Sequence, residues 1–172
     1  MVQTSYIITF IGDDRPGLVE RLASVIESNG GNWHESRLSQ LGGKFAGLIL
    51  VALPAAGGAS LEADLSALAA SGLSVRVTAT SEQSSPVAGR TITLTVLGPD
   101  RPGIVREISR TLAQHAVNVL EMDSQVSSAA MSAELMFRAH IVAWIPEGTA
   151  MDDLTDTLDG IANHMTLEID LT

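Results

Sequence analysis

A short phrase with chemistry-bearing side chains occurs twice in the chain, at residues 13–17 and 99–103. It reads Asp-Asp-Arg-Pro-Gly in the first copy and Pro-Asp-Arg-Pro-Gly in the second, 86 positions later. Each copy follows an apolar, strand-like run and precedes apolar residues at helical spacing. A helix start offers backbone N–H groups that lack intrahelical partners, at the positive end of the helix dipole. We therefore expect two anion-binding junctions.

The other residue types in the phrase favour a small zwitterion. Arginine supplies a fixed positive charge, glycine lets a ligand approach the backbone closely, and aspartate can hold an ammonium group. A polyphosphate fits less well, because the acidic side chains would repel it. The candidate ligand-binding residues are Asp13, Asp14, Arg15, Pro16, Gly17, Leu18 and Asn32 in the first copy, and Asp100, Arg101, Pro102, Gly103, Ile104 and Asn118 in the second.

A purely structural interpretation of the same residues stays open. Asp14 or Asp100 can cap the first helical turn, and the glycine can serve close helix–sheet packing. Asn32 and Asn118 begin the second strand of each copy, where they could reach a ligand beside the adjacent loop or simply form turns.

The repeat predicts two copies of one small fold. The first copy has strand-like runs at residues 6–11, 33–41, 45–53 and 73–79, and helical spacing after Pro16 and after Ser60. Pro16 is expected as the first helical residue, Ser60 as an N-cap, and Gly72 as the end of the second helix. The second copy repeats this order, with strands at 91–97, 117–126, 135–145 and 167–171 and helices at 104–113 and 151–161. An insertion at residues 127–132 fits a hairpin tip.

The order strand–helix–strand–strand–helix–strand predicts an α+β fold of two ferredoxin-like βαββαβ modules. Each is expected to be a four-stranded antiparallel sheet with two helices on one face, because right-handed crossovers place both helices together. We expect modules at residues 1–80 and 90–172, with a polar linker at 81–89. Modules of this size bury limited cores, so a homo-oligomer is expected.

Composition excludes several classes of function. The net charge is −10 and Lys44 is the single lysine, so direct binding of nucleic acid is not expected. The chain has no cysteine, which excludes disulfides and thiolate metal sites. Neither a signal-peptide pattern nor an apolar run of about 20 residues is present, so we expect a cytoplasmic protein without a membrane segment.

No catalytic constellation stands out in the sequence. The four histidines, His34, His115, His140 and His164, are scattered and match no metal-ligand spacing. A nucleophile elbow and a phosphate-binding Walker loop are both absent from the sequence. We therefore expect a protein that is not an enzyme and carries no metal or cofactor.

The repeated Asp-Arg-Pro-Gly junction, followed by an amphipathic helix and a strand that opens at asparagine, resembles the ACT domain. Two copies in a chain of this length are similar to the glycine cleavage system transcriptional repressor family. The resemblance implies a small amino acid effector, with glycine as a candidate, and control of a DNA-binding transcriptional activator by contact. The copies differ at Asp13 and Pro99, which leaves open whether both loops bind. The alternative is a ligand-free dimerisation or assembly module.

Overall fold

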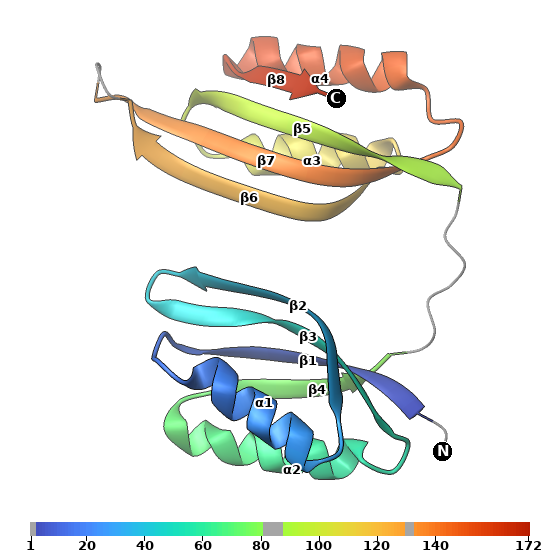
Figure 1. The fold of residues 1–172 in the computed structure, drawn as a ribbon. Helices are drawn as coiled ribbons and strands as arrows, with labels where there is room; N and C mark the ends of the chain where they lie inside the picture. Colours follow the sequence, from blue (N-terminus) through green and yellow to red (C-terminus); the bar gives the residue numbers. More distant parts are fainter. Residues whose placement is uncertain (1–2, 81–87, 130–132) are drawn as a thin grey trace. The chain divides into compact units, whose positions relative to one another are not determined.

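The computed structural model describes residues 3–80, 88–129 and 133–172 (Figure 1). The chain divides into two compact units, Met1–Ser84 and Ser85–Thr172. Most of the expected linker, residues 81–87, lies outside the described residues. Gly89, expected at the end of the linker, is instead the first residue of a strand. The exact module limits stay a prediction.

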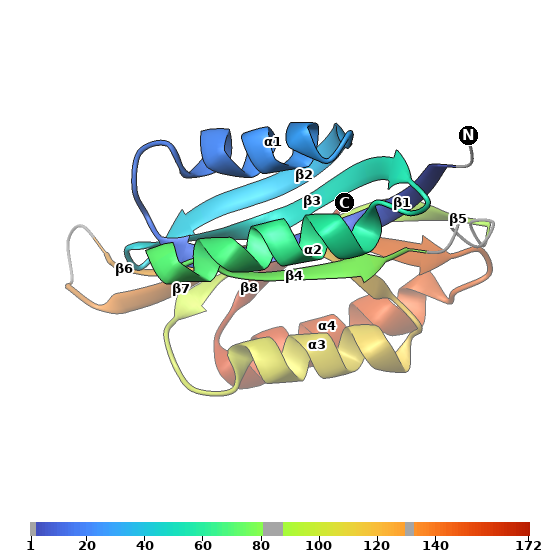
Figure 2. The same ribbon diagram turned by 90° about the horizontal axis from the view of Figure 1, so that it is seen from below.

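The first unit is a four-stranded antiparallel sheet in the order β2-β3-β1-β4. Helices α1 and α2 lie on one face of this sheet, as Figures 1 and 2 show. A short 3-10 helix, η1, follows α2 directly. The elements are β1 (Gln3–Asp13), α1 (Leu18–Ser28), β2 (Asn32–Leu41), β3 (Lys44–Pro54), α2 (Gly58–Ala67), η1 (Leu68–Ser71) and β4 (Ser74–Ala79).

The second unit repeats this architecture with the sheet order β6-β7-β5-β8. Helices α3 and α4 again lie together on one face (Figure 1). The elements are β5 (Gly89–Pro99), α3 (Ile104–Gln114), β6 (Asn118–Ser128), β7 (Leu135–Pro146), α4 (Met151–Met165) and β8 (Glu168–Leu171). The predicted α+β fold of two βαββαβ modules is confirmed.

Each unit buries its own core between the sheet and its two helices. Ile8 and Phe10 of β1 are buried on the face that the helices cover. They belong to the same hydrophobic cluster as Leu22 and Ile26 of α1. Side chains on one face of a strand recur every two residues, and side chains on one face of a helix recur about every 3.6 residues. The buried residues follow these two spacings, because each element buries only one face. The second unit has an equivalent cluster centred on residues such as Leu94 of β5 and Ile108 of α3.

The start of α2 differs from the prediction. The helix begins at Gly58, so Ser60 lies inside the first turn, and no side chain caps the helix. A Cβ atom at Gly58 would come within 2.5 Å of the Tyr6 hydroxyl. The missing side chain therefore lets the first turn lie against β1, and the helix starts earlier than the serine indicates.

Both second strands carry an irregularity at the same point. The register of β2 against β3 shifts between Trp33 and Glu35, and the register of β6 against β7 shifts between Val119 and Glu121. His34 and Leu120 are therefore extra residues in their strands, as in a β-bulge.

The expected insertion at 127–132 lies between β6 and β7. Its first two residues, Ser127 and Ser128, are the last residues of β6. The N–H of Ala129 donates to the carbonyl oxygen of Glu134 at 2.8 Å. Residues 130–132 lie outside the described residues.

Candidate functional site

The two strand–helix junctions share one backbone geometry. Gly17 and Gly103 precede α1 and α3, with φ of 85° and 102°. Each glycine carbonyl accepts the first helical hydrogen bond, from the N–H of Arg21 at 3.0 Å and of Glu107 at 2.9 Å. Neither helix has a side-chain cap at its N-terminus. The first-turn amides are therefore not occupied by a capping side chain, as an anion site requires.

The position of proline differs from the prediction. Pro16 lies in the turn before the helix, and α1 begins at Leu18. The left-handed conformation of Gly17 interrupts the helical path after Pro16, as at the third position of a type II turn. Pro102 occupies the same place before α3.

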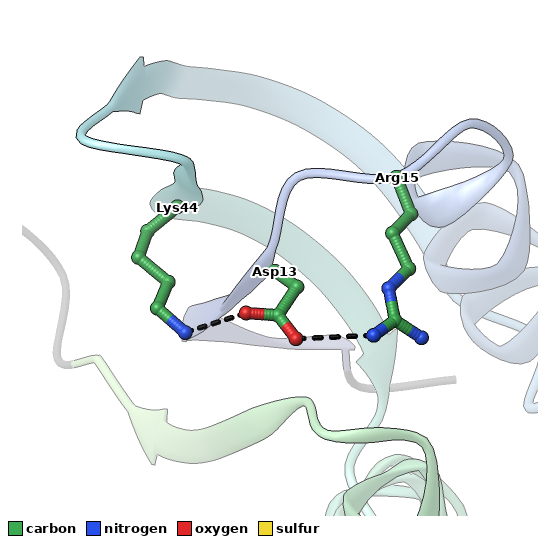
Figure 3. Close-up of polar contacts among 3 residues, drawn as sticks. All are labelled: Asp13, Arg15 and Lys44. Carbon is green, nitrogen blue, oxygen red and sulfur yellow. Dashed lines mark hydrogen bonds and ion pairs between the residues drawn. The ribbon is translucent and has the colours of Figure 1, made fainter.

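Asp13 organises the side chains of the first junction (Figure 3). Its carboxylate accepts a hydrogen bond from Nζ of Lys44 and another from Nη2 of Arg15, the latter at 3.2 Å. All three side chains are about half exposed or more. The Lys44 ammonium, by hydrogen bond and charge, and then the Arg15 guanidinium lower the pKa of Asp13 below its ordinary value.

The first junction is also tied to the tip of the β2–β3 hairpin through the backbone. The N–H of Asp14 donates to the carbonyl oxygen of Gly43 at 3.0 Å. Lys44 stands directly opposite Asp13 in the β1–β3 register. These contacts connect the hairpin tip to the junction.

Arginine has a different partner in the second junction. Pro99 replaces the organising aspartate, and Nη2 of Arg101 donates to the carbonyl oxygen of His164 at 3.2 Å. His164 lies in the last turn of α4, where carbonyl groups lack helical partners and a cation is favoured. Nε of Arg101 is buried without a hydrogen-bond partner in the described part of the chain. Arg101 thus holds α4 to the junction.

An open hollow lies beside the first junction. It is lined by Asp14, Arg15, Gly17 and Leu18 from the predicted set, together with Val19, Glu20 and Phe45, and has a volume of about 250 Å³. A second hollow on the other side of Arg15, reaching η1, holds about 10 Å³, which is room for one water. A small ligand therefore fits the Phe45 side of the loop and not the η1 side.

Two large hollows of the second unit lie away from its junction. One is lined by residues such as Arg90, Trp144 and Glu147, and has a volume of about 610 Å³. The other, of about 380 Å³, shares Arg90 and Met151 with it. Arg90 is opposite Ile145 in the sheet, and Pro99 at the junction is opposite Met136. Both hollows are thus at the far end of β5.

The two asparagines lie out of reach of the junction in their own module. Asn32 pairs with Ala52, which pairs with Ser5, eight residues along β1 from Asp13. At about 3.4 Å per residue this separation is roughly 27 Å. Asn118 pairs with Trp144, which pairs with Thr91, the same distance from Pro99. The structure does not bring the asparagines to the loops, because β2 and β6 start at the opposite end of the sheet.

The apolar members of the predicted set point into the cores. Leu18 and Ile104 are 7% and 2% exposed and belong to the hydrophobic clusters of their units. Only their backbone groups lie at the junctions. Phe45 was not among the predicted site residues. Its place beside the loop follows from the β1–β3 register, in which it stands opposite Gly12.

The described residues offer neither a metal site nor a transmembrane helix. They contain no group of three or more histidine, cysteine, aspartate or glutamate side chains placed to hold a metal ion. None of the helices in residues 3–80, 88–129 and 133–172 has the length and hydropathy of a transmembrane segment.

Comparison with known proteins identifies the family. Two family models, both described as the ACT domain, match residues 4–78 and 92–158. The chain therefore belongs to the ACT domain family and carries two copies of the domain. A search of curated proteins finds no match.

Two solved structures share the tandem fold over the full length. A crystal structure of an unknown protein from Galdieria sulphuraria is 26% identical, with a TM-score of 0.84 and coverage of 99% of this chain and 98% of that one. A crystal structure described as a "putative glycine cleavage system transcriptional repressor" is 21% identical, with a TM-score of 0.72 and coverage of 100% and 98%. At 21% identity, the similarity to this second structure shows a shared fold.

Proposed function

We propose that this chain is a non-catalytic cytoplasmic regulator that binds a small amino acid and controls a DNA-binding transcriptional activator by contact. The observation that carries the proposal is the first junction, where an uncapped helix start, the Arg15 guanidinium and a hollow of about 250 Å³ meet. Two ACT domains support a regulatory role. The net charge of −10 disfavours direct contact with nucleic acid and favours action through a protein partner.

In this proposal the ligand carboxylate binds the first-turn amides of α1 and the guanidinium of Arg15. Asp14, which lines the hollow, accepts the ammonium group. Asp13 does not line this hollow, and its contacts with Arg15 and Lys44 assign it to positioning Arg15. The hollow accommodates a small amino acid, and glycine is the first candidate to test.

Binding would act on the hairpin tip. A ligand carboxylate bound to Arg15 adds a negative charge beside Asp13, and Asp13 also binds Lys44 of the hairpin. The ligand can then shift the population of loop and hairpin arrangements, because it binds them with different affinity. A protein partner that contacts the hairpin would sense this shift.

Isothermal titration calorimetry with glycine, alanine and serine tests the site. We expect saturable binding by the intact chain, lost in Asp14→Asn and Arg15→Ala variants and retained in an Arg101→Ala variant that is still folded. Absence of heat with all three amino acids, or binding unchanged by Arg15→Ala, would contradict the proposal. Capture of a transcriptional activator from native extract, with and without the bound amino acid, tests the partner.

The second junction favours the alternative of a structural loop. Its arginine is engaged by α4, and Pro99 supplies no carboxylate. Asp100, Arg101, Pro102, Gly103 and Ile104 remain a proposed second site of lower affinity, because a ligand there must first displace Arg101 from His164. Two binding steps of equal affinity in the titration would contradict this ranking.

A further inference from the structure

One of the two large hollows of the second unit lies between α4 and the strands β5 and β8, and we call it the β5–α4 hollow. Its volume of about 380 Å³ is within the range of about 300–1,000 Å³ that is usual for small-molecule sites. All three elements contribute apolar side chains to its wall, and a cation and a carboxylate accompany them. The residues that carry the argument are Arg90, Ile92, Met151, Leu158, Asp159 and Leu171.

The first unit has a tyrosine at the equivalent place. Tyr6 of β1 and Ile92 of β5 are 86 residues apart and occupy equivalent register positions. Gly58 and Met151 are the first residues of α2 and α4, and buried leucines follow three and seven residues later in both helices. The Tyr6 side chain lies directly against Gly58. The second unit therefore replaces the pair Tyr6–Gly58 by the pair Ile92–Met151.

This exchange removes an aromatic ring from the second unit. Ile92 is 2% exposed and belongs to the core, whereas Met151 is only partly buried, and both line the hollow. Methionine is flexible, and its sulfur makes favourable contacts with aromatic rings. The hollow thus has an adaptable apolar wall at the place where the first unit carries its own ring.

The charged side chains give the hollow two different ends. Arg90 is exposed, and its guanidinium has no hydrogen-bond or ion-pair partner among the described residues. Arg90 and Met151 also share the neighbouring hollow, so both mark the same end. Asp159 lies eight residues after Met151, about 12 Å further along α4. Asp170 also borders the hollow, but the alternation in β8 directs its side chain to the other face of the sheet.

We propose that the β5–α4 hollow binds a small aromatic carboxylate. The ligand carboxylate accepts hydrogen bonds from the Arg90 guanidinium, and the ring packs against Met151 and Leu171. A hydroxyl group on the far side of the ring donates to the Asp159 carboxylate. The site lies at the opposite end of β5 from the strand–helix junction, so it is separate from the proposed amino acid site at residues 13–18.

Isothermal titration calorimetry of the intact chain with 4-hydroxyphenylacetate tests the site. We expect saturable binding, weakened about tenfold or more in an Arg90→Ala variant, because a charge-assisted hydrogen bond is lost. The matched first-unit variant Thr4→Ala should bind as the unmodified chain does. The probe 4-hydroxybenzyl alcohol, which lacks the carboxylate, should bind more weakly and be insensitive to Arg90→Ala. Absence of heat with 4-hydroxyphenylacetate, or equal binding by the Arg90→Ala variant, would overturn the proposal.

A second test fills the hollow from within the protein. The double variant Ile92→Tyr, Met151→Gly recreates the pair of the first unit, and we expect it to lose 4-hydroxyphenylacetate binding while circular dichroism shows that it is folded. A single variant, Met151→Trp, places a ring at the rim of the hollow without changing the core and should also lose binding. Retained binding in a folded filling variant would overturn the proposal.

The two proposed sites fail independently in these titrations. Arg15→Ala should leave 4-hydroxyphenylacetate binding unchanged, and Arg90→Ala should leave glycine binding unchanged. Loss of 4-hydroxyphenylacetate binding in the Arg15→Ala variant would overturn the assignment to the β5–α4 hollow.

Discussion

The two strand–helix junctions have the same backbone and different side-chain partners. Gly17 and Gly103 both adopt positive φ, and both helices start without a capping side chain. Yet Arg15 is 63% exposed and pairs with its neighbour Asp13, whereas Arg101 donates to the last turn of a helix 63 residues away. The repeated motif therefore gives both junctions the same backbone geometry for an anion, but its arginine contacts a different partner in each copy. Arg15 is available to a ligand, and Arg101 connects its junction to the last turn of α4.

The largest expected difference between the junctions is in stability. We expect Arg101→Ala to lower the free energy of unfolding of the second unit by about 2 kcal/mol, because a charged hydrogen bond to a helix end is lost. Arg15→Ala, which removes an exposed ion pair, should leave unfolding unchanged. Urea unfolding followed by tryptophan fluorescence in Trp33→Phe and Trp144→Phe backgrounds reports on each unit alone, since Trp33 lies in the first unit and Trp144 in the second. If Arg101→Ala and Arg15→Ala lowered the free energy of unfolding equally, the two arginines would not differ in their structural role.

The shared backbone predicts an equal, smaller effect at the two glycines. Gly17→Ala and Gly103→Ala should each destabilise their own unit by about 1 kcal/mol, because an L side chain is strained at positive φ. No atom lies within 4 Å of a Cβ atom at Gly17, and the nearest to one at Gly103 is 4.0 Å away, so the cost is conformational and not steric. Gly160→Ala, in the interior of α4, serves as a control that should stabilise. Markedly unequal costs at the two junctions would show that their backbones differ in solution.

The smallest expected effect distinguishes Asp13 from Pro99, which cannot titrate. We expect the carboxyl of Asp13 to titrate below 3.8 in carbon-detected NMR, and Lys44→Met to bring its pKa back toward that value. A lowered folded-state pKa means that ionised Asp13 stabilises the fold above the unfolded-state pKa. This contribution is lost as the pH falls through the folded-state pKa. An unchanged titration in the Lys44→Met variant would mean that the ion pair does not form.

Most of the fold followed from local patterns in the sequence. Alternation in the strands and helical spacing after each junction predicted the order of elements, and the repeat predicted two modules. Predictions failed where backbone packing decided a boundary. Ser60 looks like a cap, but Gly58 packs against Tyr6 and starts the helix earlier. Pro16 fits a first helical position, but the φ of Gly17 excludes it from the helix.

Only those features of the candidate site that involve residues close together in the sequence could be predicted. The junctions themselves were visible as motifs, and the Lys44 partner of Asp13 follows once β1 and β3 are paired in register. Asn32 and Asn118 begin β2 and β6 as predicted. Their suggested reach to the adjacent loop does not hold within their own module, because nearness in sequence to the helix end does not say which end of the sheet they occupy. The bond from Arg101 to His164 joins residues far apart in the chain, and neither residue type nor spacing signals it.

The extra residues His34 and Leu120 stand 86 positions apart, each at the same step of its strand. One insertion in a common ancestor explains both extra residues more simply than two independent insertions at the same point. A single ancestral domain that already contained this irregularity accounts for both. Duplication of such a domain explains why the irregularity occurs in both strands although the arginine contacts of the two copies differ.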